Sequence, residues 1–154
     1  MIRGNKTILI VDDDEKVLKT ISKYLASKGY AVETATTGRE ALQKSGSQFF
    51  NLAILDIRLP DMEGTRLLTE LCETEPKMKK IMLTGYPSMD NAVESLNKRA
   101  DAYVIKPIEP KKLLTLIEEK LAEQEEELKM DRKKLVTYIE SRDKEMGNNR
   151  RKSA

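Results

Sequence analysis

Five short apolar runs along the chain alternate with longer segments in which apolar residues recur every three or four positions. The runs occupy residues 8–11, 31–35, 52–55, 81–83 and 102–105, and each has the length of a β-strand. The third run, Leu-Ala-Ile-Leu, is apolar throughout, which is typical of a strand covered on both faces in a parallel sheet. The segments between the runs have helical spacing, as at Val17, Ile21 and Leu25. The pattern therefore predicts a doubly wound α/β fold, in which a parallel sheet lies between two layers of helices.

Helix boundaries are marked at several of the expected places. Thr37 with Glu40 three residues later is a capping-box pattern, and Ser88 precedes the fourth predicted helix. Gly29 lies where the first helix should end. These signals support the alternation of strands and helices.

Polar side chains follow four of the five predicted strands. They are Asp12, Asp13 and Asp14 after the first strand, Asp56 after the third, Thr84 at the end of the fourth and Lys106 after the fifth. In a doubly wound sheet, ligands bind at the edge formed by the carboxyl ends of the strands. We therefore expect carboxylates, a hydroxyl and an ammonium group to converge at that edge.

Together, these residues indicate a more specific chemistry than any of them does alone. Singly, Asp13 and Asp14 fit helix caps, Asp56 fits the start of a turn, and Lys106 fits a surface lysine. Clustered carboxylates repel one another unless a cation lies between them, and an oxygen-only ligand set without His or Cys selects Mg²⁺ or a similar ion. Beside such an ion Asp56 would be the nucleophile in a phosphoryl transfer, and Lys106 would neutralise charge on the phosphoryl oxygens.

Composition narrows the class of protein further. The 154 residues include 28 Lys or Arg and 26 Asp or Glu, a formal net charge of +2, which gives no electrostatic case for a protein that coats DNA or membranes. The chain has no His, so any phosphohistidine must belong to another protein. Cys72 is the only cysteine, and no apolar run approaches the ~20 residues of a membrane span. We expect a cytoplasmic protein without a disulfide.

Four motifs in this order resemble the receiver domain of two-component response regulators, the CheY-like family. They are ILIVDD at residues 8–13, LDIRLPDMEG at 55–64, Thr84-Gly85, and ADAYVIKP at 100–107. The resemblance extends from residue 6 to about residue 122. It implies a five-stranded sheet in the flavodoxin-like order 2-1-3-4-5. It also implies a phosphorylation-activated signalling protein rather than an enzyme with external substrates, and a sensor histidine kinase or phosphotransfer protein as partner.

The resemblance implies a role for each residue at the predicted edge. Asp56 corresponds to the phosphoacceptor. Asp12, Asp13, Asp56 and the main-chain carbonyl of Arg58 correspond to the ligands of Mg²⁺, the implied cofactor. Lys106 corresponds to the lysine that pairs with the phosphoryl group.

A switch is implied as well. Thr84 corresponds to a hydroxyl that moves toward the phosphoryl group, and Tyr103 to an aromatic side chain that turns inward on activation. The surface of the fourth helix, fifth strand and fifth helix would change as the balance between two pre-existing states shifts. The bond between Lys106 and Pro107 corresponds to one that is usually cis.

Two features depart from the family pattern or modify it. Arg99 precedes Ala100 where family members often have Gly. Arg58 and Tyr86, each two residues past a site residue, are large side chains at positions that tune the lifetime of the aspartyl phosphate. They would either shield the phosphoryl group from water or only cover the mouth of the site.

Three other functions fit part of the pattern. An Asp-nucleophile phosphatase also uses Asp after a buried strand with Mg²⁺, but that class usually has an acid where this chain has Arg58. A flavin-binding module needs a phosphate loop after the first strand, where the aspartates would repel a phosphate. The third alternative is a receiver-like interaction module that is never phosphorylated, and the intact set of family positions argues against it.

The C-terminal part of the chain differs in composition, since half of residues 109–154 are charged and cannot build a second core. We expect a receiver domain over residues 1–122, a helical extension over 123–146 and a frayed polar tail over 147–154. A helix starting at Pro110 and ending at Met146 would be longer than the receiver can cover.

Leucines at seven-residue spacing, Leu121, Leu128 and Leu135, make this extension half of a coiled coil. Gln124 and Asp131 interrupt the repeat if Leu is taken as its a position, and Glu118, Glu125 and Arg132 interrupt it if Leu is taken as d. Our hypothesis is a homodimer through this helix that transmits the phosphorylation state of the receiver. The alternatives are a homodimer through the surface of the fourth helix, fifth strand and fifth helix, and a solvated single helix held by Glu and Lys pairs. Neither a membrane nor a nucleic acid is expected as a partner.

Overall fold

The computed structural model describes residues 6–71 and 73–152. Strands and helices alternate through them. The elements are β1 (Thr7–Val11), α1 (Glu15–Ser27), β2 (Ala31–Ala35), α2 (Gly38–Ser47), β3 (Leu52–Leu55), α3 (Gly64–Glu70), β4 (Lys79–Thr84), α4 (Met89–Asn97), β5 (Ala102–Ile105) and α5 (Pro110–Lys152). All neighbouring strands pair in parallel in the order β2-β1-β3-β4-β5, which confirms the predicted doubly wound, flavodoxin-like fold.

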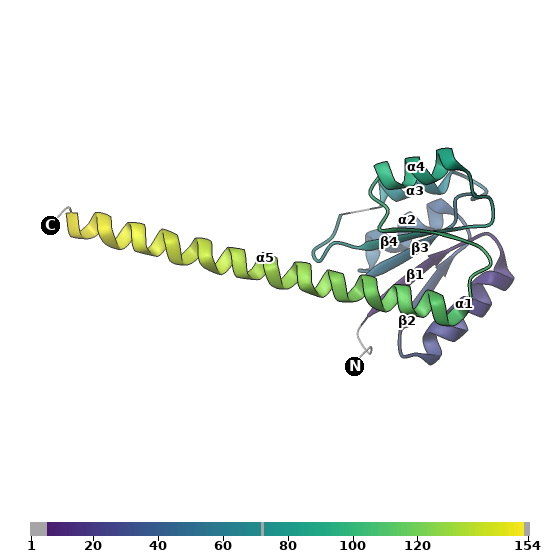
Figure 1. Ribbon diagram of the computed structural model, residues 1–154, viewed down its shortest axis with the longest axis horizontal. Coiled ribbons are helices and arrows are strands. Elements are labelled where there is room, and N and C mark those ends of the chain that lie inside the picture. The colour runs from purple at the N-terminus through teal and green to yellow at the C-terminus, as the bar shows by residue number, and fades with distance from the viewer. Residues whose placement is uncertain (1–5, 72, 153–154) are drawn as a thin grey trace.

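The helices cover the two faces of the sheet, with α1 and α5 on one side and α2, α3 and α4 on the other (Figure 1). Successive residues of β1 point to opposite faces. Ile8 and Ile10 pack with Leu18 of α1 and Ile117 of α5, whereas Leu9 lies in the core beneath α2 and α3. Both faces of the central strands are therefore buried, as their uninterrupted apolar sequence indicates.

Local signals set the helix ends. Asp14 is the N-cap of α1 and accepts hydrogen bonds from two backbone amides of the first turn. Thr37 caps α2, and Ser88 forms a reciprocal capping box with Asn91 at the start of α4. Gly29, which follows α1, has a φ of 96°, a left-handed conformation that glycine adopts without steric cost.

Helix α4 presents its apolar residues to solvent. Met89, Val93 and Leu96 are 78%, 47% and 61% exposed, while Ser95 is fully buried. The helical spacing of Val93 and Leu96 is typical of a core-facing stripe, but the residues of α4 that are not exposed are the smaller Asn91, Ala92 and Ser95. The result is an exposed apolar patch, defined here as the α4 patch of Met89, Val93 and Leu96.

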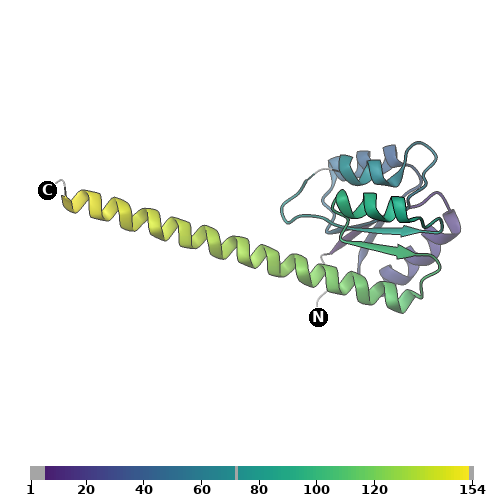
Figure 2. The ribbon, with the colours of Figure 1, turned by 45° about the horizontal axis from the view of Figure 1, so that its top comes forward.

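Helix α5 runs past the sheet and continues far beyond it (Figure 2). It extends to Lys152, which is beyond the end at Met146 and lies inside the segment expected to fray. The boundary between receiver and extension near residue 122 stays a prediction, and residues 153 and 154 of the expected tail lie outside the described residues. None of the helices in the described part of the chain has the length and apolarity needed to cross a membrane.

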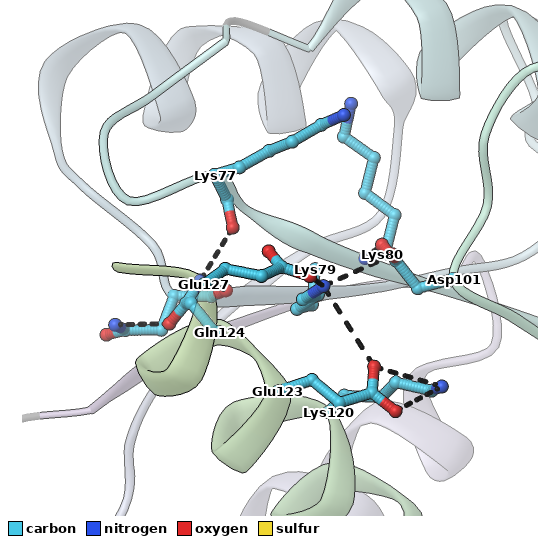
Figure 3. A network of polar contacts seen from close by, with 9 residues as sticks. Lys77, Lys79, Lys80, Asp101, Lys120, Glu123, Gln124 and Glu127 are labelled. Atoms are coloured by element: carbon cyan, nitrogen blue, oxygen red, sulfur yellow. Dashed lines mark hydrogen bonds and ion pairs between the residues drawn. The ribbon is translucent and has the colours of Figure 1, made fainter. Parts of the chain in front are cut away.

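The helix is fastened at the amino edge of the sheet by polar groups (Figure 3). Gln124, 1% exposed, donates hydrogen bonds to the carbonyls of Asn51 (2.8 Å) and Lys77 (2.7 Å) and accepts one from the Asn51 side chain (3.1 Å). Lys79, at the start of β4, donates to Glu127 at 2.7 Å and lies 3.7 Å from Asp101. These contacts, which we call the α5 anchor, involve residues past the predicted end of the receiver.

Candidate functional site

Backbone pairing brings the carboxyl ends of β1 and β3 together. The amide of Asp12 donates to the carbonyl of Ala35 at 3.1 Å, and the amide of Asp56 donates to the carbonyl of Val11 at 3.0 Å. Asp12 and Asp56 are buried, and Asp13 is exposed. Oxygen atoms of these three carboxylates all lie within 4.8 Å of one another. The structure thus assembles the acidic cluster that the sequence predicts.

Lys106 completes the cluster from β5. Its amide donates to the carbonyl of Thr84 at 2.7 Å, so the end of β5 is aligned with the end of β4. Its ammonium group forms an ion pair with Asp12 and lies 3.3 Å from Oδ2 of Asp56. The Lys106-Pro107 peptide bond is cis, as the resemblance implies.

The electrostatics of the cluster favour binding of a cation or an electrophile. Burial, followed by the negative charge of Asp12, raises the pKa of Asp56, and the opposing charge of Lys106 does not reverse this. Burial acts to lower the pKa of Lys106, but the hydrogen bond and charge of Asp12 and the charge of Asp56 outweigh it, so that pKa is raised. Lys106 therefore stays protonated, while the carboxylate of Asp56 lacks full compensation of its charge.

The donor set fits Mg²⁺. All three side chains offer hard carboxylate oxygens, the group includes no Cys, and the chain has no His to favour a softer ion. The amide of Arg58 lies 3.4 Å from Oδ1 of Asp56, so the backbone at Arg58 adjoins the cluster. The role of its carbonyl as a ligand stays a prediction.

The two large residues at the mouth of the site contact each other. The guanidinium of Arg58 lies over the ring of Tyr86, 4.2 Å from the ring centre. Both side chains are exposed. This stacked pair connects the loop after β3 to the loop after β4 above the acidic cluster.

Thr84 and Tyr103 are connected by hydrogen bonds through two other residues. The Thr84 hydroxyl accepts from the amide of Tyr86 at 2.9 Å, and the Tyr86 carbonyl accepts from the Asn91 side chain at 3.1 Å. The amide oxygen of Asn91 in turn accepts from the Tyr103 hydroxyl. Asn91 was not singled out from the sequence, where its only signal is its position three residues after Ser88.

The loop after β3 is shaped by Gly64 and Asp61. A Cβ atom on Gly64 would lie 1.9 Å from the carbonyl oxygen of Asp56, so no other residue fits without moving the acidic residue. Asp61 accepts hydrogen bonds from the amides of Gly38 and Arg39, at 2.8 and 2.9 Å, which lower its pKa. Asp61 thus fastens this loop to the start of α2 rather than contributing to the acidic cluster, a role that the sequence motif did not indicate.

An apolar hollow of about 320 Å³ adjoins Lys106. Its walls are α1, with Val17, Ile21 and Tyr24, and the segment before α5, with Pro107 and Ile108. This hollow is the apolar surface that a protein approaching the cluster from the side of α1 would meet.

Solved structures resemble this chain in fold and sequence. A response regulator receiver domain protein (CheY-like) from Methanospirillum hungatei JF-1 is 55% identical, with a TM-score of 0.77, and the match covers 79% of this chain and 98% of that one. A response regulator from Burkholderia pseudomallei with a phosphorylated aspartic acid, calcium ion and citrate is 32% identical, with a TM-score of 0.70. That match covers 80% of this chain and 72% of the other.

Curated relatives are longer proteins. The transcriptional regulatory protein ZraR of Escherichia coli (strain K12) is 35% identical over 122 residues, which are 79% of this chain and 28% of ZraR. This chain therefore spans less than a third of the length of that relative. The family model described as the response regulator receiver domain matches residues 8–118, the region that contains all four motifs. The chain belongs to the response regulator receiver domain family of two-component systems.

Proposed function

We propose that this protein is a phosphorylation-activated receiver in which Asp56 accepts a phosphoryl group from a partner histidine kinase or phosphotransfer protein. The observation that carries the proposal is the position of Asp56, a buried carboxylate with a raised pKa between Asp12 and Lys106. The relative with a phosphorylated aspartic acid and a bound calcium ion supports the same chemistry. The donor must be another protein or a small phosphodonor, since this chain has no His.

Asp12, Asp13, Asp56 and the carbonyl of Arg58 would hold Mg²⁺. When bound, the ion supplies positive charge that offsets the clustered carboxylates and the oxygens of the incoming phosphoryl group. An oxygen of the Asp56 carboxylate forms the new bond to phosphorus as the bond from phosphorus to the donor atom breaks. No general base is required because the nucleophile is already ionised near pH 7. Lys106, held by Asp12, neutralises a phosphoryl oxygen.

The hydrogen-bonded series from Thr84 to Tyr103 provides the switch. A phosphoryl group on Asp56 adds negative charge and acceptor oxygens beside the end of β4. The Thr84 hydroxyl would turn to donate to it and give up the bond from the Tyr86 amide. Because Tyr86 and Tyr103 both bond to Asn91, this change reaches the first turn of α4. The α4 patch and the adjoining Ile105, 54% exposed, form the surface that a target would recognise.

The surfaces of the receiver also indicate where partner proteins would bind. The phosphodonor protein would approach at the hollow beside Lys106, and the protein acts as a signalling module that turns over only its own phosphoryl group. Our expectation that nucleic acid is not a partner has no support from the relatives, because ZraR is a transcriptional regulatory protein. Whatever protein contains this receiver, Asp56 would control it through the α4 patch.

Mass spectrometry of the intact protein tests the assignment. After incubation with Mg²⁺ and a small acyl phosphate, the wild-type chain should gain the mass of one phosphoryl group, and Asp56→Asn should gain none. Asp61→Asn is the matched control, because Asp61 is in the same loop but bonds to α2. Chelation of the metal should abolish labelling. Labelling of Asp56→Asn, or none of the wild type, would show that the assignment is wrong and leave an interaction module or a phosphatase as the alternatives.

A further inference from the structure

Helix α5 has an apolar face that runs from Leu113 to Met146, and the receiver covers only the first part of it. The covered part consists of Leu113, Ile117, Leu121 and the polar Gln124. The bare part consists of Leu128, Leu135, Ile139 and Met146. Each residue follows its predecessor by three, four or seven positions, so all of them project from the same side of the helix. The bare part therefore faces the side on which the receiver lies, but below the edge of the sheet.

The α5 anchor fixes this orientation. Gln124 bonds to Asn51 and Lys77, and Lys79 bonds to Glu127 (Figure 3). Gln124 and Glu127 lie within the turn that precedes Leu128. Burial alone would lower the pKa of Lys79, but its hydrogen bond to Glu127 and the charges of three carboxylates raise it, so the lysine stays charged. The helix cannot turn about its axis without breaking these contacts. The direction of the bare face is thus set by the receiver.

This direction excludes a side-by-side parallel pair of straight helices. A second α5 packed on the bare face and running in the same direction would continue into the space that the first receiver occupies, beside the upper part of the helix (Figure 2). An antiparallel helix that pairs only over residues 128–146 avoids this overlap, because this stretch lies past the α5 anchor. The paired stretch is roughly 28 Å long at ~1.5 Å per residue.

The sequence of the bare segment is compatible with antiparallel pairing. Leu128 and Met146 lie equally far from Thr137 on either side, and Leu135 and Ile139 do too. An antiparallel pair centred at Thr137 therefore puts leucine against methionine and leucine against isoleucine at matched levels. The same alignment brings Arg132 of one helix to within one residue of the level of Asp143 on the other.

We propose that two copies of this chain associate through the bare face of α5 as an antiparallel helix pair centred at Thr137. The two helices then pair over residues 128–146, and the two receivers lie at opposite ends of the pair. The proposal does not depend on phosphorylation of Asp56.

Analytical ultracentrifugation of the full chain tests the association. The wild type should be a dimer at tens of micromolar, and the double variant Leu135→Lys with Ile139→Lys should be a monomer. Thr137→Lys is the matched control, since it adds a lysine on the opposite side of the same turn and should leave the dimer intact. A monomeric wild type overturns the proposal. So does a double variant that remains a dimer, which would point to the α4 patch instead.

Spin-label distances test the direction. In a Cys72→Ser background, single labels at Met130, Thr137 and Lys144 lie on the outer side of the helix, away from the bare face. The antiparallel pair predicts the shortest distance between labels at residue 137 and clearly longer ones at 130 and 144. Similar distances at all three positions would indicate parallel helices and overturn the proposed arrangement.

Discussion

Folding shifts the pKa values of two neighbouring aspartates, Asp56 and Asp61, in opposite directions. Burial and the charge of Asp12 raise the pKa of Asp56, so folding disfavours its ionised form. Two backbone amides at the start of α2 lower the pKa of Asp61, so folding favours its ionised form. The ionised carboxylate of Asp56 therefore costs stability in the metal-free protein, while that of Asp61 contributes to stability.

The first prediction concerns the stability of the metal-free protein. At pH 7 the Asp56→Asn variant should be more stable than the wild type by roughly 1 kcal/mol, because a neutral side chain replaces a buried charge. The advantage should shrink as the pH falls through the raised pKa of Asp56, where the wild type also becomes neutral. Thermal unfolding with a chelator present, repeated from pH 7 to pH 4, measures this.

Asp61→Asn supplies the contrast in the same experiment. It should destabilise the protein at pH 7, and its effect should fade as acid protonates Asp61 below its ordinary pKa. Added Mg²⁺ should stabilise the wild type more than Asp56→Asn. If Asp56→Asn is destabilising in the absence of metal, the pair with Lys106 outweighs the burial of the charge.

Arg99 has an unusual backbone conformation for a residue with a side chain. Its φ is 67°, in the left-handed region where a side chain is disfavoured, at the position where the sequence departs from the family's usual Gly. The departure noted in the sequence is therefore a backbone feature at the end of α4.

At the scale of elements, the fold could be predicted because its signals are local and repeated. Each strand is a short apolar run bounded by polar residues, and the side-chain pairs at the ends of β1, β3, β4 and β5 follow from the common direction of parallel strands. The acidic cluster and Lys106 could be placed for that reason. The strand β4 begins at Lys79 rather than Ile81, because a lysine that is paired with carboxylates can be buried at a strand start.

The contacts that could not be predicted connect distant parts of the chain through polar side chains. Periodicity treats Gln124 as an interruption of an apolar face, but its amide satisfies carbonyls at Asn51 and Lys77 that lie far away in sequence. Asn91 and Asp61 are equally inconspicuous, since each acts through one or two hydrogen bonds to another element. Val93 shows the reverse case, an apolar residue that helical spacing suggests is buried and that is half exposed.

The α5 anchor can be tested by removing its central side chain. Gln124→Ala should destabilise the receiver by roughly 2–3 kcal/mol, because the side-chain amide group of Asn51 and the carbonyl of Lys77 lose their hydrogen bonds to Gln124. Amide exchange near residues 121–127 should accelerate as well. Glu126→Ala, an exposed neighbour, is the control and should change the free energy of unfolding little. Chemical denaturation measures both, and equal stability of the two variants would mean that apolar packing alone holds α5.

At the scale of the whole molecule, the phosphoacceptor lies at the carboxyl ends of the strands and the α5 anchor at their amino ends. Asp12, Asp56 and Lys106 follow strand ends, whereas Lys79 begins a strand and Asn51 precedes one. The route from Thr84 leads to Asn91 and α4, and none of the bonds described for it involves α5. The signal and the proposed dimer would therefore use different surfaces.

The last prediction follows from this separation. Phosphorylation of Asp56 should change amide exchange in α4, but the dissociation constant of the dimer should stay within about threefold, a difference below ~0.7 kcal/mol. The physical reason is that the Gln124 and Lys79 contacts give α5 one orientation, and a ligand shifts an equilibrium only by its different affinity for two states. Sedimentation of the phosphorylated and unphosphorylated chain, with exchange measured on the same samples, provides both readouts. A tenfold change in the dissociation constant would instead show that α5 itself has two positions on the receiver, and that the helix transmits the state of Asp56.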